Sequence, residues 1–126
     1  TETPGLYVGI EPGSVFVGGG LYMPWGDQLK AIRKAIIAKP EEYLAVVDDK
    51  RFKKVFGGIM GDKLQKAPLG IAKDHPMIEH LKHKQFFVGK EWNTESLCYY
   101  KKFSDTIAEV FIDTMPLVRW LIAATV

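Results

Sequence analysis

Four side chains could together carry acid–base chemistry on a negatively charged substrate: Glu11, Asp62, Lys63 and His75. An imidazole titrates near neutral pH, carboxylates accept protons, and a lysine holds negative charge. The four lie far apart in the chain, so they form a site only if their loops meet at one end of a sheet. They are the candidate catalytic residues of an enzyme for a small anionic or phosphorylated substrate. The alternative is that they are turn residues and surface ion pairs, which contribute little individually.

A second set of residues could bind such an anionic ligand without catalysis, because ammonium groups and glycine backbone amides attract anions. The set comprises Gly18, Gly19, Gly20, Lys66, Asp74, Lys82 and Lys84. Three consecutive glycines in a strand indicate either a backbone-lined anion pocket or a β-bulge beneath a packed aromatic ring. We favour the bulge.

Three histidines and Glu79 raise the question of a metal site. His80 and His83 are three residues apart and could share one helix face, with His75 nearby. The pattern places both on the polar side of a stripe that contains Leu81, so we predict no metal site and no cofactor. For His75 we favour a structural role at a helix start over catalysis.

Residues 5–24 must position the glycines, and their pattern predicts a β-hairpin. Apolar side chains alternate along residues 6–10, and Pro12 and Gly13 have the backbone preferences of a type II turn. The return strand is expected to start near Val15. Its odd-numbered and even-numbered residues then face opposite sides of the sheet.

The rest of the chain predicts helices separated by turn residues. A helix capped by Asp27 extends to about residue 39, Pro40 opens a second, and a third over residues 49–56 ends at two glycines. Residues 57–70 are irregular. Within them, 59–64 form either a short strand pair or a loop.

Later segments predict a helix that starts at Asp74 or His75, a strand over residues 85–89, and a long final helix that starts after Asn93 or Thr94. Pro116 interrupts that helix and is expected to kink or split it. We therefore predict an α+β fold: a small antiparallel sheet with an N-terminal hairpin, covered by four or five helices.

Composition bounds the function further. Residues 1–126 suit a single domain, 47% apolar and 25% charged, with a net charge of +2. No apolar stretch is long enough to cross a membrane, and the single Cys98 agrees with a reducing cytoplasm. Adjacent Phe86 and Phe87 point to opposite faces of a strand, which argues against base stacking and makes nucleic acid an unlikely partner. These features favour a ligand-binding or interaction domain. The alternative is an enzyme for a small anionic or phosphorylated substrate.

Three segments carry a resemblance to a known family: Ile10-Glu11-Pro12-Gly13, residues 61–64 followed by Pro68 and Gly70, and Asp74-His75-Pro76. With the proline-interrupted last helix, they resemble the C-terminal half of the bacterial domain-of-unknown-function 2461 family. The resemblance implies a fold and a bacterial origin. It implies no mechanism, because the family has no established activity.

The same resemblance implies that an N-terminal half is missing here. Family members are longer, and their diagnostic R-D-x-R-F run has no counterpart in a chain that begins with Thr1. We therefore expect this chain to be the C-terminal half of a longer domain. A sheet edge and an apolar face would then be uncovered, so the chain is expected either to bind its other half or to self-associate. Arginines of that half could complete the site for an anion.

Overall fold

The computed structural model describes residues 3–93 and 100–125 and confirms an α+β fold. The elements, in chain order, are β1 (Gly5–Glu11), β2 (Ser14–Leu21), α1 (Gly26–Ala38), α2 (Pro40–Val47), α3 (Lys50–Phe56), α4 (Ile78–Leu81), β3 (Phe86–Asn93) and α5 (Tyr100–Thr125). The three strands form one antiparallel sheet in the order β1-β2-β3. The opening hairpin thus supplies two strands, and β3 pairs with its second strand.

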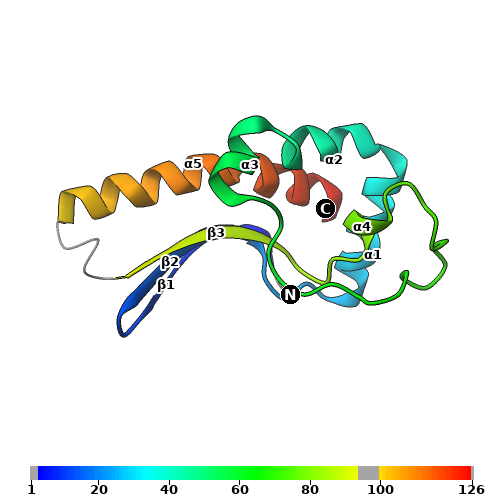
Figure 1. Cartoon of the computed structure of the whole chain (residues 1–126), viewed down its shortest axis with the longest axis horizontal. Helices are drawn as coiled ribbons and strands as arrows, with labels where there is room; N and C mark the ends of the chain where they lie inside the picture. The colour runs from blue at the N-terminus through cyan, green and yellow to red at the C-terminus, as the bar shows by residue number, and fades with distance from the viewer. Residues whose placement is uncertain (1–2, 94–99, 126) are drawn as a thin grey trace.

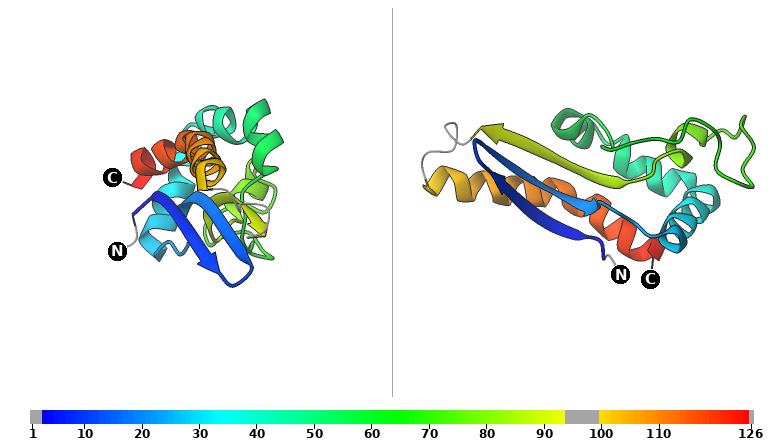
Figure 2. Two further views of the ribbon diagram at one scale, coloured as in Figure 1. Left: turned by 90° about the vertical axis from the view of Figure 1, so that its left-hand side faces the viewer. Right: turned by 90° about the horizontal axis from the view of Figure 1, so that it is seen from below.

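The long helix α5 lies along one face of the sheet (Figure 1). At its C-terminal end α5 packs against α1, α2 and α3, which form a helical layer with the short α4 nearby. Seen from below, no described helix covers the opposite face of the hairpin (Figure 2). The sheet therefore has one covered face and one open face.

The hairpin forms as the sequence predicts. Pro12 and Gly13 alone connect the two strands, and Gly13 adopts the positive φ of 84° that favours glycine. Val17 and Leu21 are fully buried on the helix side, whereas Phe16 and Tyr22 face the open side. The alternation of residue types gives β2 one aliphatic face, and α5 covers that face.

The expected β-bulge at the glycine triplet is wrong, but the packed aromatic ring is present. Pairing continues without an extra residue from Ser14 to Leu21 on both sides of β2. A β-carbon at Gly18 would stand 3.0 Å from Cε1 of Phe16 and 2.8 Å from Cα of Gly89. The glycine therefore makes room for a ring and for the neighbouring strand within a regular ladder.

Helices α2 and α3 follow their predicted boundaries closely, and α1 ends at Ala38, close to the predicted end near residue 39. Ile32 and Ile36 of α1 and Tyr43 of α2 are fully buried. Asp49 caps α3, because its carboxylate accepts a hydrogen bond from Phe52 N (3.1 Å), and Gly57 ends α3 with φ 80°. These helices build the larger core cluster together with Leu117 and Leu121 of α5 and Phe86 of β3.

Two predicted helix starts are wrong. Helix α1 begins at Gly26, so Asp27 lies in its first turn, where its carboxylate accepts from Gln28 N (3.0 Å) and suits the helix dipole. Helix α4 begins only at Ile78, because Asp74 and His75 belong to a preceding run of turns. In that run, Nδ1 of His75 accepts a hydrogen bond from Met77 N (3.0 Å).

Residues 59–64 form a loop and not a strand pair. Met60 and Lys63 each make an isolated bridge, to Phe87 and His83 respectively. The loop therefore follows the outer edge of β3 and the turn before it, with Met60 N donating to Phe87 O (2.9 Å).

Pro116 does not split the last helix, since α5 is continuous from Tyr100 to Thr125. The predicted start after Asn93 or Thr94 lies outside the described residues. Proline removes the N–H that would bond the carbonyl of Ile112. Ile112 is 69% exposed and Pro116 is exposed as well, so water can reach that carbonyl group.

Candidate functional site

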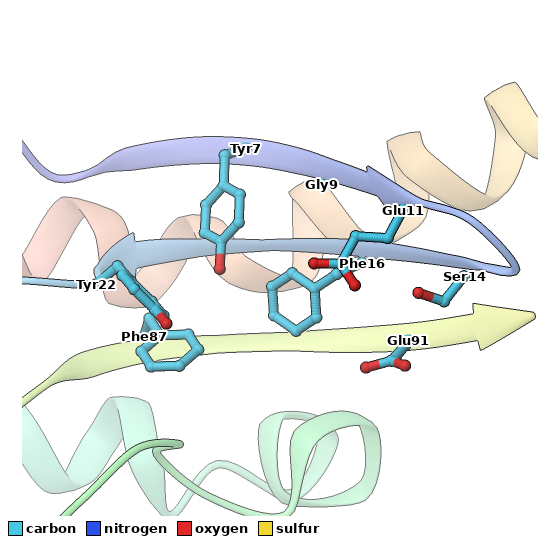
Figure 3. Close-up of a pocket in the computed structure, with 8 residues that line it drawn as sticks. All are labelled: Tyr7, Gly9, Glu11, Ser14, Phe16, Tyr22, Phe87 and Glu91. Carbon is cyan, nitrogen blue, oxygen red and sulfur yellow. The ribbon is translucent and has the colours of Figure 1, made fainter.

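The open face of the sheet carries a hollow of about 500 Å³ (Figure 3). Its lining comes from all three strands and from the residue after β2: Tyr7, Gly9, Glu11, Ser14, Phe16, Tyr22, Phe87 and Glu91. Four of these side chains are aromatic and two are carboxylates. We call this the sheet hollow.

The aromatic rings of the sheet hollow contact one another in a chain. Tyr7 stacks on Phe16 with ring centroids 5.4 Å apart, and Phe16 meets Phe87 edge-on at 6.3 Å. Tyr22 meets Phe87 edge-on at 5.0 Å. Such contacts hold rings in fixed orientations, so the apolar wall of the hollow is preorganised.

Glycines shape the floor of the sheet hollow: Gly9 lines it, and Gly18 and Gly89 lie beneath the Phe16 ring. Antiparallel pairing places Tyr7, Gly18 and Gly89 in one row across the sheet, and Gly9 and Phe16 in the next. A β-carbon at Gly89 would stand 2.8 Å from Cε1 of Phe16, so the ring lies over glycine backbone. Gly9, the glycine that lines the hollow, leaves the space beside that ring without a side chain.

The two carboxylates lie at the turn end of the sheet hollow. Glu91 of β3 is directly opposite Phe16, and Glu11 of β1 is opposite Ser14 in the adjoining row. Figure 3 shows both carboxylates on the Phe16 side of the hollow, with Tyr22 and Phe87 at the other end. Among the described residues, no lysine, arginine or histidine lines the hollow. The hollow thus has an apolar end and an acidic end.

A second hollow, of about 380 Å³, lies between α1 and the loop that carries Leu69. Lys30, Arg33 and Lys34 line it, and no acidic residue in the described ranges does. Arg33 also donates from Nε to Leu81 O (2.9 Å) and from Nη2 to His83 O (3.1 Å). We call this the basic hollow.

A third hollow, of about 280 Å³, contains His80 and His83. His83 is 7% exposed, which contradicts its predicted place on a polar face, and its Nδ1 has no hydrogen-bond partner among the described residues. Burial, reinforced by Lys63 and His80, lowers the pKa of His83 to about 4. The imidazole is therefore neutral at pH 7.

The aromatic neighbours of these histidines explain their burial. The ring of His83 packs edge-on against Phe86 (5.6 Å), and His80 packs edge-on against Tyr43 (5.4 Å). Burial lowers the pKa of His80 and raises that of Tyr43. The histidines thus help to complete the core between α2, α4 and β3.

The four candidate catalytic residues occupy different places. Glu11 lines the sheet hollow, and Lys63 lines the third hollow and pairs with Glu79 (3.6 Å). Asp62 is exposed, and its backbone N–H donates to Gln85 Oε1 (2.9 Å). The imidazole of His75 bonds its own turn. Their catalytic roles stay predictions.

The candidate ligand-binding residues are also distributed. The register places Gly18 and Gly20 on the open face, and Gly19 faces α5, where a β-carbon would stand 3.3 Å from Thr114 Oγ1. Lys82 pairs with Glu79 (3.4 Å). The remaining candidates are exposed on loops: Lys66, Asp74 and Lys84.

Sequence reasoning missed Tyr7, Tyr22, Phe87 and Glu91 as site residues. Phe16, Gly18 and Gly20 are all even-numbered, so the sequence alone could place them on one face of the strand. Glu91 could not be found in this way, because its place depends on the register between β2 and β3. Phe86 and Phe87 do face opposite sides, as predicted: Phe86 is in the core, and Phe87 lines the sheet hollow.

The described residues contain neither a metal-binding cluster nor a membrane-spanning helix. Across residues 3–93 and 100–125, no three potential ligand residues gather closely enough to hold a metal ion. In the same ranges, no helix combines the length and apolar character that crossing a bilayer requires.

The fold and the site together define an α+β domain with an aromatic and acidic hollow on its open sheet face. The chain belongs to the domain-of-unknown-function 2461 family, whose model, described as "Conserved hypothetical protein", matches residues 1–120. No curated protein matched the chain, and neither did any solved structure. The family description names no activity, so the function must be argued from the site.

Proposed function

We propose that this domain binds a small ligand in the sheet hollow. The observation that carries the proposal is a hollow of about 500 Å³ with an aromatic wall and a glycine floor. Ligand sites are typically concave and apolar, with a few polar groups that orient the ligand. Here those polar groups are Glu11, Ser14 and Glu91.

The packing of Phe16 supports binding over a purely structural role for these rings. A core aromatic is normally covered on both sides, whereas Phe16 and Tyr7 are only half-buried and Tyr22 is 48% exposed. The sheet keeps apolar rings in contact with solvent at a position that α5 does not cover. A ligand would bury them.

A substitution of Gly9 tests this proposal, because it can fill the hollow without a clash. Apart from its two chain neighbours, the only described heavy atom within 4 Å of a β-carbon at Gly9 is Cβ of Phe16, at 4.0 Å. Gly9→Val should therefore fold and occupy the space. A screen of small ring compounds by two-dimensional NMR should shift the amides of Gly9, Gly18 and Gly89 in the native chain and leave them unchanged in Gly9→Val.

The control for this screen is Gly58→Ala, since a β-carbon at Gly58 meets no atom within 4 Å and Gly58 lies outside the hollow. This variant should bind as the native chain does. A screen in which no compound shifts the hollow amides, or in which Gly9→Val binds equally well, would contradict the proposal.

A second candidate, binding or turnover of a small anionic or phosphorylated compound, is favoured by the basic hollow. Its three cations and absence of acidic lining suit an anion. Titration with phenyl phosphate should shift the amides of Lys30 and Lys34, and Lys30→Gln/Lys34→Gln should abolish those shifts. Hydrolysis of the phosphate that depends on His75, Asp62 or Lys63 would support the enzyme alternative. No shift at all would remove this candidate.

We also propose that β1 pairs with a strand of an N-terminal half in a longer chain, this chain being the C-terminal half of that domain. Among the described residues β1 pairs with β2 alone. Leu6, Val8 and Ile10 on its helix side are 39%, 38% and 71% exposed. An edge strand with exposed apolar side chains readily pairs with another strand.

The mass of this chain in solution tests that proposal. Light scattering should give an associated species for residues 1–126 alone, and a one-to-one complex when an N-terminal half is co-expressed. A stable monomer that binds neither an N-terminal half nor a second copy would contradict it.

The predicted location of the protein, a reducing cytoplasm, rests on the single Cys98.

A further inference from the structure

The sheet hollow is negatively charged, a property that its shape does not explain. Two carboxylates, Glu11 and Glu91, line it, and no basic side chain of the described part of the chain does. Neither carboxylate forms an ion pair with any residue in the described part of the chain, although other acidic residues such as Asp48, Glu79 and Asp113 do. The two carboxylates of the hollow therefore have no counter-ion among the described residues.

The register fixes where this charge lies relative to the rings. Glu91 is the direct cross-strand neighbour of Phe16, and Gly9 is the neighbour of Phe16 on the other side. Glu11, two residues beyond Gly9, occupies the same face of β1. A group seated over Gly9 would thus lie beside the Phe16 ring, with Glu11 next to it along β1 and Glu91 beyond the ring on β3 (Figure 3).

We infer that the sheet hollow selects a small organic cation, such as a quaternary ammonium compound. The inference rests on the proposed function and names its ligand class. Aromatic faces attract organic cations through their electron-rich centres, and carboxylates add a direct charge attraction. Tyr7, Phe16 and Phe87 provide the apolar and aromatic contacts, and Glu11 and Glu91 provide the charge.

Other ligand classes fit this hollow less well. An anion would be repelled by two carboxylates, and the separate basic hollow, lined by Lys30, Arg33 and Lys34, suits it better. A divalent metal ion prefers several oxygen ligands and keeps its water shell, which aromatic rings replace poorly. An alkylated ammonium ion has a weakly hydrated apolar surface and a full positive charge, so it can use both ends of the hollow.

Matched probes separate the cation inference from the proposal that the hollow binds ligands at all. Choline carries a trimethylammonium group, and its neutral carbon isostere dimethylbutanol has the same shape without the charge. Titration of the native chain with choline, followed by NMR, should shift the amides of Gly9, Gly18 and Gly89. Dimethylbutanol should bind about fivefold or more weakly, the size of one good cation–π or charge contact.

Substitutions of the carboxylates provide the second arm. Glu11→Gln/Glu91→Gln should weaken choline about fivefold or more and leave dimethylbutanol unchanged. Glu41→Gln is the matched control, since Glu41 is exposed on α2 and does not line the hollow. Added salt should weaken choline binding in the native chain and have little effect in the double variant.

Each outcome has a defined meaning. Equal binding of choline and dimethylbutanol, insensitive to the carboxylates, would overturn the cation inference and leave the proposed ligand site standing. Tight binding of Ca²⁺ in preference to choline would overturn it in favour of a metal. Absence of choline binding would also overturn the cation inference. The ligand site itself would be overturned by an empty ring-compound screen, or by a screen in which Gly9→Val binds as well as the native chain.

Discussion

The ring of Phe16 lies over Gly89 of the neighbouring strand, so closely that a β-carbon at Gly89 would stand 2.8 Å from Cε1 of the ring. The same β-carbon would stand 2.7 Å from the carbonyl oxygen of Val17. This contact between a ring on β2 and a glycine on β3 shows that the ring lies against the surface of the sheet and does not project away from it. The sheet hollow depends on that orientation.

Gly89→Ala should therefore destabilise the domain. The methyl group cannot enter without moving both the Phe16 ring and the backbone of β2 or β3, and overpacking of this kind costs about 1–3 kcal/mol. Urea denaturation followed by circular dichroism measures the loss. Gly58→Ala, where a β-carbon meets nothing within 4 Å, should change the free energy of unfolding by less than about 0.5 kcal/mol.

A double-mutant cycle shows how much of that cost comes from Phe16. In Phe16→Ala the ring is absent, so adding Gly89→Ala should cost less than it does in the native chain. The contact with Val17 O persists, so the relief should be partial. Strict additivity of the two substitutions would show that Phe16 does not lie over Gly89.

The burial of His83 predicts a loss of stability in acid. Its folded pKa of about 4 is below the ordinary value of 6.5, so the unfolded chain takes up a proton first as the pH falls. The contribution of His83 to the free energy of unfolding is at its maximum above about pH 6.5. It is lost progressively as the pH falls to about 4. The loss for this group is about 3 kcal/mol.

The measurement is the free energy of unfolding between pH 8 and pH 4, in the native chain and in His83→Phe. The variant should show a shallower dependence on pH in this window. Burial of His80 acts in the same direction, so some dependence should persist. An NMR titration in which His83 gains its proton near pH 6.5 in the folded protein would disprove the prediction.

Much of the fold could be predicted from the sequence, because local signals dictate it. The alternation in residues 6–10, the Pro12-Gly13 turn and the proline that opens α2 all act over a few residues, and each forms as predicted. The start of α4 could not be predicted, since His75 bonds Met77 N and holds a turn where the pattern alone suggested a helix.

The site was less predictable, because it depends on contacts between strands that are far apart in sequence. Glu11 was singled out for catalysis with His75 and Lys63, yet it lines a hollow with Glu91, a residue that no local motif marks. The pairing of Phe16 with Glu91 spans β2 and β3. Likewise, His83 looks polar in sequence, and only the packing of Phe86 against its ring shows that it is buried.

Arg33 should stabilise the domain by joining α1 to the turn between α4 and β3. It donates to two carbonyl oxygens, Leu81 O at 2.9 Å and His83 O at 3.1 Å, and both acceptors belong to buried residues. Arg33→Met keeps the apolar stem and removes both hydrogen bonds, which should lower the free energy of unfolding by about 1–3 kcal/mol. Lys34→Met, one residue further along α1 and exposed, is the control and should change it by less than about 0.5 kcal/mol.

Ile10→Lys should weaken whatever association the β1 edge supports. Ile10 is 71% exposed on an edge strand whose sequence from Gly5 to Ile10 carries no charge, and lysines on edge strands oppose pairing with another chain. Light scattering over a range of concentrations should show less associated species than in the native chain. Leu69→Lys, which adds the same charge at a fully exposed loop position, should leave the mass unchanged. If both variants reduced association equally, net charge would be the cause, and the β1 edge would not be the interface.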